Sequence, residues 1–251
     1  MLSRAAGGMR RRFFVERFEG RQARLTGEQA HHLGRVLRAR PGQLYELSDG
    51  RDVWLGRVTR VNREAIEFTL LEPVAAATPG LHVVLLLAIV KFDRFEWCLE
   101  KATELGASEI VPLAAARSER HLVAAAAKRA ARWQKILLES AQQARRVAPP
   151  VLHAVAEPKA AFAQAQHDRA ALAVLLSERR DTPPLRTVLA SQQVRTALLA
   201  IGPEGGWTDA ELELARQTGF AEASLGPQIL RTETAVIAAL AILHYALGAE
   251  G

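Results

Sequence analysis

Two glycine-bearing segments near the end of the chain have the composition of ligand-binding loops. Residues 201–208 read Ile-Gly-Pro-Glu-Gly-Gly-Trp-Thr, and residues 225–235 read Leu-Gly-Pro-Gln-Ile-Leu-Arg-Thr-Glu-Thr-Ala. Each segment follows an apolar run that predicts a strand, and each precedes a predicted helix. Glycine lets a backbone approach a ligand closely, and ligands of open α/β sheets bind outside the carboxyl ends of the strands. The two segments therefore predict a binding site made of loops, although either one alone could be an ordinary strand-to-helix turn.

A third segment, residues 176–178, follows the predicted strand before these two and would complete a site of three adjacent loops. Neither Gly-x-Gly-x-x-Gly nor Gly-x4-Gly-Lys-Ser/Thr occurs in the chain, which argues against a Rossmann dinucleotide site and a P-loop. The residues predicted to contact the ligand are Leu176, Ser177, Glu178, Ile201, Gly202, Pro203, Gly205, Gly206, Leu225, Gly226, Ile229 and Leu230.

The chain offers little for metal or thiol chemistry. Cys98 is the single cysteine, so no internal disulfide can form, and no group of Cys and His has metal-ligand spacing. Cys98 recurs with Phe95, Leu99 and Ala102 at helical spacing, which predicts core packing and not a nucleophile. We therefore expect no metal, and a protein suited to a reducing cytoplasm.

The part of the chain that carries the loops alternates between strands and helices. This order predicts an α/β fold with a mainly parallel sheet covered on both faces. Strands are predicted at residues 81–90, 109–113, 151–155, 171–176, 196–201 and 221–225. Helices are predicted at residues 92–105, 123–146, 185–191, 208–218 and 232–247. Thr208 and Glu211 form a capping box at the start of one of these helices, which places the first glycine loop directly before it.

The first 75 residues read mostly as short strands. Residues 44–47 and 53–61 form a predicted hairpin, because Asp49-Gly50 supplies the positive φ that tight turns require. A second turn at residues 62–64 leads into a strand at residues 65–70. A small β-barrel is the expected result.

One helix interrupts the strands of this region. Thr26 and Gln29 form a predicted capping box, and Leu33, Val36 and Leu37 supply an apolar stripe at helical spacing. Several basic side chains accompany the stripe, so the helix is expected to present positive charge. The stretch between this region and the sheet, residues 73–80, lacks periodicity and is bracketed by prolines. The expected division is an N-terminal extension at 1–8, a barrel domain at 9–74, a linker at 75–80 and an α/β domain at 81–251.

Charge is distributed unevenly along the chain. Residues 1–75 carry a net charge of +5 and residues 76–150 one of +4, whereas residues 151–251 carry −3. Such asymmetry indicates a polyanionic partner such as RNA, with a solvated charged surface as the alternative. Hydrophobic residues make up 49% of the chain, enough for a core, but the longest apolar runs are shorter than the ~20 residues that span a bilayer. A membrane protein is not expected.

The two glycine loops together carry a resemblance that neither shows alone. Ile-Gly-Pro-Glu-Gly-Gly followed by Leu-Gly-Pro-x-Ile-Leu-Arg-Thr-Glu-Thr-Ala resembles the small-subunit ribosomal RNA methyltransferase E family, of the SPOUT class. Arg12-Phe13-Phe14, residues 31–38, Lys91, residues 101–106, and Pro112 with Arg117 also resemble that family, over residues 9–247. One departure is Gln142, where the family more often has Glu, which puts the role of that carboxylate in doubt.

The resemblance implies a PUA-like N-terminal β-barrel that binds RNA and a C-terminal SPOUT domain with a deep trefoil knot. It implies a cytoplasmic homodimer that uses S-adenosyl-L-methionine to methylate N3 of a uridine in 16S rRNA of the small ribosomal subunit. The knot and the dimer depend on the resemblance alone. The residues expected to contact RNA are Arg12, His32, Arg35, Arg38, Arg117, Arg120 and Arg145.

Methylation at N3 requires a group that stabilises a uracil anion, because neutral N3 carries a proton and is a poor nucleophile. Arg231, at a predicted helix start in the second glycine loop, is the leading candidate for an electrostatic clamp, with a phosphate or structural contact as the alternative. Glu204 could orient the cofactor or RNA, or accept the proton, but could equally be a local cap. Two other functions stay open: a SPOUT methyltransferase for tRNA or a ribose 2′-hydroxyl, and a non-catalytic RNA-binding or ribosome-assembly factor.

Overall fold

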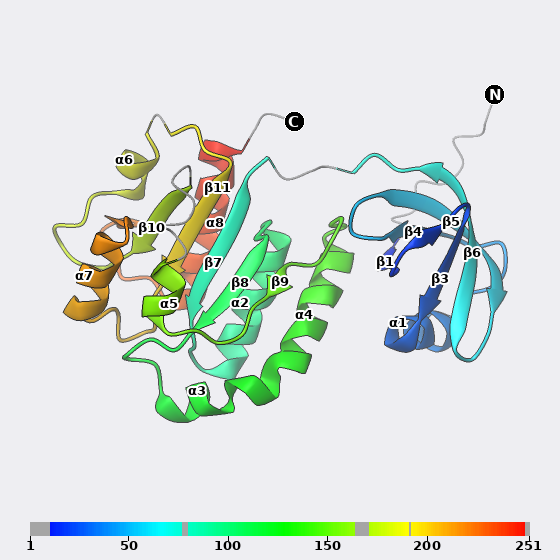
Figure 1. The fold of residues 1–251 in the computed structure, drawn as a ribbon, viewed down its shortest axis with the longest axis horizontal. Helices are drawn as coiled ribbons and strands as arrows, with labels where there is room; N and C mark the ends of the chain where they lie inside the picture. The colour runs from blue at the N-terminus through cyan, green and yellow to red at the C-terminus, as the bar shows by residue number, and fades with distance from the viewer. Residues whose placement is uncertain (1–10, 77–79, 164–170, 191, 249–251) are drawn as a thin grey trace. The chain divides into compact units, whose positions relative to one another are not determined.

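The computed structural model describes residues 11–76, 80–163, 171–190 and 192–248. The chain folds as two compact units, drawn in Figure 1. The first unit comprises Met1–Thr78 together with Ala141–Pro149, and the second comprises Pro79–Ser140 and Pro150–Gly251. The extension expected at residues 1–8 and part of the expected linker lie outside the described residues.

Within the described residues, the first unit contains a six-stranded sheet in the order β1-β4-β5-β6-β3-β2. Its strands are β1 (Arg12–Phe14), β2 (Phe18–Glu19), β3 (Gln22–Thr26), β4 (Leu44–Ser48), β5 (Val53–Val61) and β6 (Ala65–Pro73). The predicted hairpin is confirmed, because β4 and β5 pair antiparallel around Gly50, which has a φ of +89°. The second predicted turn is confirmed as well, because β5 pairs with β6 across residues 62–64.

The helix of the first unit differs from its prediction. It consists of α1 (Gly27–His31) followed by one π-helical turn, His32–Val36, in which the Leu37 amide donates to the His32 carbonyl at 3.0 Å. The predicted capping box is wrong: Thr26 makes no side-chain cap, and Gln29 instead binds the backbone N–H and carbonyl of Phe14. The Gln29 side chain, which a capping box would have used, instead forms hydrogen bonds with β1.

The π-helical turn also divides the predicted apolar stripe. Leu33 is fully buried, whereas Val36 is 61% exposed. A π-helical turn contains more residues than an α-helical turn. Val36, three residues after Leu33, therefore no longer lies on the buried face that Leu33 occupies.

A segment distant in sequence, residues 141–149, belongs to the first unit. Arg12 forms a buried ion pair with Glu46, at 2.9 Å, and also donates to the Arg145 carbonyl. The Ser48 hydroxyl donates to the Val147 carbonyl at 2.5 Å. Residues of β1 and β4 thus hold this segment by its backbone.

The second unit is built on a parallel sheet in the order β12-β10-β11-β7-β8-β9. Figure 1 labels the strands from β10 to β9 in this order. Its described strands are β7 (His82–Ala88), β8 (Glu109–Leu113), β9 (Val151–Leu152), β10 (Leu172–Leu176), β11 (Thr196–Ile201) and β12 (Ala221–Ala223). Every neighbouring pair in this order is parallel. The predicted α/β class and parallel sheet are confirmed.

The described helices of the second unit are α2 (Phe92–Glu104), α3 (Arg120–Ala126), α4 (Ala130–Gln143, whose last residues belong to the first unit), α5 (Pro158–Ala163), α6 (Leu185–Leu189), α7 (Asp209–Gln217) and α8 (Thr232–Leu247). The single helix predicted at residues 123–146 is wrong, because a 3-10 turn at Ala127–Arg129 separates α3 from α4. Its run of alanines favours helix throughout and carries no signal for the break. Helix α5 was not predicted.

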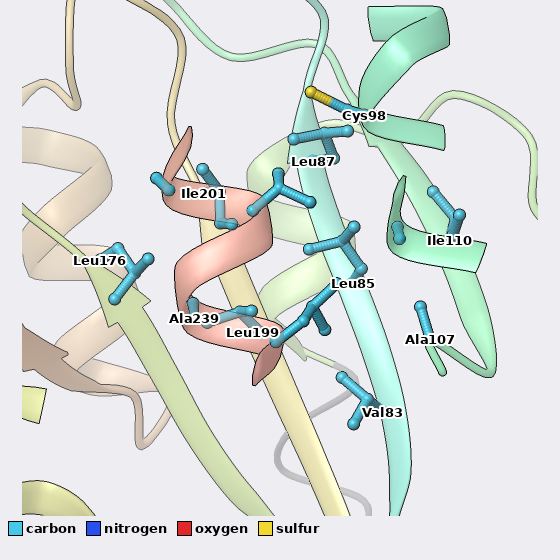
Figure 2. Packing of buried hydrophobic residues seen from close by; sticks show 14 of the residues in the cluster. Val83, Leu85, Leu87, Cys98, Ala107, Ile110, Leu176, Leu199, Ile201 and Ala239 are labelled. Atoms are coloured by element: carbon cyan, nitrogen blue, oxygen red, sulfur yellow. The ribbon is translucent and has the colours of Figure 1, made fainter. Parts of the chain in front are cut away.

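The continuous apolar run of β7 is explained by burial on both of its faces. Val83, Leu85 and Leu87 pack in a core with residues of α2, α4, α6 and α8, as Figure 2 shows in part. Leu86 and Ala88 pack on the other side, in a second core with residues of α5 and α7. Side chains alternate across a strand, so a strand covered on both sides needs apolar residues at every position.

Cys98 lies in the first of these cores, on α2 (Figure 2). Burial raises the pKa of its thiol to about 12, and the negative charge of Glu233 adds to the rise. The thiol therefore stays protonated at neutral pH, and the prediction of a packing role is confirmed. No helix among the described residues has the length and apolar character needed to cross a membrane.

Candidate functional site: a loop-lined cavity at the end of the sheet

A cavity of about 310 Å³ lies at the carboxyl ends of β10, β11 and β12. Because these strands are parallel neighbours, the loops that follow them meet at one edge of the sheet. All of the predicted ligand contacts line this cavity except Gly205 and Ile229. The lining residues are Arg117, Leu176, Ser177, Glu178, Arg179, Ile201, Gly202, Pro203, Glu204, Gly206, Trp207, Asp209, Leu212, Leu225, Gly226, Gln228, Leu230, Thr232 and Ala235.

The first glycine loop, residues 202–207, is fixed at its helical end by the predicted capping box. The Thr208 side chain accepts from the Glu211 amide, and the Glu211 carboxylate accepts from the Thr208 amide at 2.8 Å. Glu211 is almost fully buried, and its carboxylate also accepts a hydrogen bond from the Ala116 amide at 2.8 Å. The local motif therefore doubles as a tertiary contact to the segment after β8.

Two further side chains hold this loop by its backbone. Trp207 donates its indole N–H to the Leu176 carbonyl at 3.0 Å, which ties the loop to the end of β10. Arg117 donates through Nη1 to the Gly205 carbonyl at 2.7 Å and to the Trp207 carbonyl at 3.1 Å. Gly205 does not line the cavity but packs against Arg117, because a Cβ there would meet the Arg117 side chain at 3.4 Å.

Glycine is required at two lining positions. Gly206 has a φ of +69°, and a Cβ there would come within 3.0 Å of the Glu178 carboxylate. Gly226, in the second glycine loop, has a φ of +136°, and a Cβ there would meet no atom within 4 Å, so this residue borders open space. Both φ values lie in the region that L-residues with side chains rarely adopt.

Two ion pairs involve charged groups of the cavity wall. Arg179 binds the Asp209 carboxylate at 2.7 Å, and Glu204 forms an ion pair with Arg94 of α2. Sequence reasoning missed Arg179, Asp209 and Arg94 as site residues. Arg179 directly follows Glu178, a predicted ligand contact, so the sequence could have indicated it. Arg94 lies far from the loops in sequence, and only the pairing of β7 with β11 brings it near Glu204.

Arg231, the predicted clamp, is the N-cap residue of α8 and its side chain is exposed. It does not line the cavity, but its neighbours Leu230 and Thr232 do. Thr232 also reaches the first glycine loop, donating from Oγ1 to the Gly202 carbonyl at 3.4 Å. Arg231 therefore stands at the rim of the cavity, on the second glycine loop.

The residues predicted to contact RNA fall in both units. His32, Arg35 and Arg38 are exposed on and after the π-helical turn, and Arg145 is exposed on the segment that binds the same unit. Arg12, in contrast, is only 4% exposed and its guanidinium is engaged by Glu46, so it supports the Arg145 segment and presents no surface to a phosphate.

In the second unit, Arg120 is exposed at the start of α3, and Arg117 lines the cavity. Gln142, the departure from the family pattern, donates to the Gln29 side chain at 2.6 Å within the first unit. A carboxylate at this position could not donate that bond, so the amide has a structural partner of its own.

The cavity suits an organic ligand of mixed character. Its walls combine apolar side chains such as Leu212 and Leu225 with loop backbone and several charged groups, and its volume is within the usual range for small-molecule sites. Among the residues that the structure describes, no three His, Cys, Asp or Glu side chains are grouped as metal ligands would be.

Sequence comparison assigns both units to RNA methyltransferases. Residues 77–244 match the family described as the RNA methyltransferase domain, and residues 25–71 match the RNA methyltransferase PUA domain. A ribosomal RNA small subunit methyltransferase E from Synechocystis is 36% identical over 224 residues, covering 88% of this chain and 72% of the relative. The enzyme of the same name from Bacillus subtilis is 30% identical over 227 residues, covering 88% and 89%.

Solved structures of similar fold are also methyltransferases. A ribosomal RNA small subunit methyltransferase E from Neisseria gonorrhoeae, bound to S-adenosyl methionine, superimposes with a TM-score of 0.86 at 29% identity, covering 95% of this chain and 98% of the other. A Legionella pneumophila protein described as a methyltransferase, in complex with the same cofactor, gives a TM-score of 0.82 at 28% identity, covering 95% and 98%. The α/β fold with an N-terminal PUA-like domain is confirmed.

Proposed function

The chain belongs to the ribosomal RNA small subunit methyltransferase E family of S-adenosylmethionine-dependent RNA methyltransferases, and from this premise we propose that it methylates N3 of one uridine in 16S rRNA. The observation that carries the proposal is the cavity at the carboxyl ends of β10, β11 and β12, where both glycine loops of the family pattern meet.

The residues of the cavity fit S-adenosylmethionine. The cofactor supplies, when bound, a methyl group on a positively charged sulfur. Leu176, Leu225 and Leu230 offer apolar walls to an adenosine, and Gly226 leaves open space beside the loop backbone. The Glu178 carboxylate provides negative charge for a cationic ligand. The preformed loop from Gly202 to Trp207 reduces the ordering that binding requires.

The protein must also manage the uracil base. N3 becomes a good nucleophile when it loses its proton, and the resulting anion spreads its charge over O2 and O4. Arg231 stands at the cavity rim with an exposed guanidinium, whose planar donors and permanent charge suit a uracil carbonyl oxygen. We assign it the role of stabilising the anion. Glu204 lines the same cavity and is assigned to orienting the ligands.

We assign RNA binding to the exposed cations His32, Arg35, Arg38 and Arg145 of the first unit, together with Arg120 of the second. Two of them, Arg38 and Arg145, have positive φ values of 53° and 52°. Non-glycine residues in this conformation are uncommon and concentrate at functional positions, which supports the assignment. The partner is 16S rRNA or the small ribosomal subunit, and the place of action is the cytoplasm.

We further infer a homodimer and a trefoil knot, both drawn from the SPOUT resemblance. In support of the dimer, Trp97 of α2 is 42% exposed and Ile242 and Tyr245 of α8 are 38% and 93% exposed, although α2 and α8 pack against each other. Exposed large hydrophobic side chains on helices that pack together are a feature of protein interfaces. Sedimentation of the purified protein tests the dimer, and a monomer at micromolar concentration would contradict it.

Mass-spectrometric mapping of 16S rRNA from a strain that lacks this protein tests the proposed function. We expect one uridine to lose its N3-methyl group, and the group to return when the wild-type gene is restored. Loss of a methyl group from tRNA or from a ribose would favour the alternative methyltransferases. Unchanged methylation of all RNA would favour a non-catalytic assembly factor.

A further inference from the structure

The ion pair between Arg94 and Glu204 connects the cavity to a helix that does not line it. Arg94 lies in the first turn of α2, directly after β7, and Glu204 lies in the first glycine loop, directly after β11. β7 and β11 are paired neighbours whose carboxyl ends lie together, with Leu87 opposite Ile201. Glu204 lines the cavity and Arg94 does not, so Arg94 can influence bound ligands only through Glu204.

The backbone of the loop does not depend on this ion pair. Arg117 holds the Gly205 and Trp207 carbonyls, and the Trp207 indole holds the end of β10. Loss of the Arg94 side chain would therefore leave the loop in place while releasing the Glu204 carboxylate. The pair controls the position and charge of one side chain and not the shape of the cavity.

The charge matters because the proposed reaction creates a second negative charge near the cavity. A carboxylate without a partner would repel a uracil anion and disfavour its formation, because a like charge nearby raises the free energy of the charged form. Arg94 is partly shielded, with a side chain 30% exposed, and Glu204 is 46% exposed. The ion pair thus keeps Glu204 in the cavity wall with its charge compensated.

We propose that Arg94 is a positioning residue for methyl transfer, which acts by orienting the Glu204 carboxylate and compensating its charge beside the reacting base. This inference rests on the proposed function, because it concerns the rate of that reaction. It predicts that the contribution of Arg94 depends entirely on the presence of the Glu204 carboxylate.

A double-mutant cycle measures this dependence. The variants are Arg94→Ala, Glu204→Gln and the double variant, with Arg94→Lys as a test of rescue by charge alone. Arg132→Ala is the matched control. Arg132, on α4, forms an ion pair at 2.7 Å with Glu96, which lies on the same helix as Arg94, and neither residue lines the cavity. Each variant is assayed for thermal stability, for S-adenosylmethionine affinity by calorimetry, and for the single-turnover rate of methyl transfer to rRNA from a strain that lacks the modification.

We expect Arg94→Ala to lower the single-turnover rate about tenfold, a typical coupling between contacting charges, with cofactor affinity within about twofold of wild type. Arg94→Lys should recover part of the rate, and Arg132→Ala should leave it unchanged. In the Glu204→Gln background, removing Arg94 should have no further effect on the rate.

Equal losses from Arg94→Ala in both backgrounds would overturn the inference, as would a loss expressed only in cofactor affinity or an equal loss in Arg132→Ala. These results leave the proposed function intact, since the wild-type protein would still methylate the rRNA. If the wild-type protein binds the cofactor and transfers no methyl group, the proposed function itself is wrong and the role of Arg94 falls with it.

Discussion

The two glycine loops of the cavity are held very differently. The first, residues 202–207, is bound through its backbone by Arg117 and Trp207, and the helix after it is fixed by the Thr208 capping box. In the second, residues 225–231, no side chain hydrogen-bonds another residue that the structure describes, and Ile229 is 77% exposed. The two loops follow β11 and β12, which lie on either side of β10 in one sheet, and both contain a glycine with a positive φ.

The contrast indicates that the two loops have different roles. A preorganised loop favours binding because little order has to be gained, whereas exposed groups on a loop without internal partners are available to an incoming molecule. We infer that the first loop presents a fixed surface to the cofactor. The second loop closes the remaining side of the cavity and offers Arg231 to the RNA base. The following predictions test that difference, from the largest expected effect to the smallest.

Arg231→Ala should lower the rate of methyl transfer by roughly 10² to 10³, the usual effect of removing one hydrogen-bond donor to the negative charge that develops in a transition state. Cofactor affinity should change little, because Arg231 does not line the cavity. Higher pH supplies more uridine anion without help from the protein, so the single-turnover rate should rise more steeply with pH in this variant than in wild type. Parallel pH profiles, or a defect confined to cofactor affinity, would leave Arg231 a binding or structural residue.

Gly226→Val should weaken S-adenosylmethionine binding by roughly a hundredfold, equivalent to about 2.7 kcal/mol, because a branched side chain would fill the open side of the cavity. The matched control is Gly219→Val, since Gly219 has a φ of +93° in the same unit but does not line the cavity. Calorimetry of both folded variants measures the difference. Similar affinities in the two would mean that backbone strain, and not occupied space, decides the result.

Arg117→Ala should weaken cofactor binding about tenfold, because the first loop would lose two hydrogen bonds from a charged donor. The result also separates two roles of this side chain, which was expected from sequence to contact RNA. Arg120→Ala, a few residues away and exposed, is the control for cofactor affinity, which it should leave unchanged. If Arg117→Ala instead weakens RNA binding and spares the cofactor, the RNA role is the correct one and the first loop is fixed without Arg117.

Thr208→Ala should have the smallest effect, a loss of about 1 kcal/mol in the free energy of unfolding, typical of an N-cap replacement. The loop keeps its contacts to Arg117 and β10, so cofactor affinity should fall by less than the loss in Arg117→Ala. Denaturant titration and calorimetry give the two values. A larger loss of affinity than of stability would show that the capping box, and not the arginine, holds the first loop in its binding shape.

Local patterns in the sequence were sufficient where local physics decides the structure. The bounds of β8, β11 and α8 follow from apolar periodicity, and the Thr208 capping box and the Gly50 turn follow from short motifs. The loops that line the cavity could be located for the same reason, since the carboxyl ends of neighbouring parallel strands must meet.

Long-range contacts account for what the sequence could not predict. Gln29 has the right spacing for a capping box with Thr26, yet it binds the backbone of Phe14 from another strand. Arg12 has the charge of an RNA contact, yet Glu46 holds it in the interior. Arg94 carries no local mark of its pairing with Glu204, which lies far along the chain. In each case the deciding partner is distant in sequence.

The central claim is that the cavity formed by the two loops serves methyl transfer to uridine N3 in 16S rRNA. Its most direct test combines the purified protein, S-adenosylmethionine labelled in the methyl group, and small ribosomal subunits from a strain that lacks the protein, followed by digestion of the RNA and identification of the labelled nucleoside. We predict that the label appears as 3-methyluridine from a single position, and that, at a cofactor concentration just sufficient for the wild type, Gly226→Val strongly reduces it while Gly219→Val does not. Label in any other nucleoside, or equal transfer by both valine variants, would contradict the account.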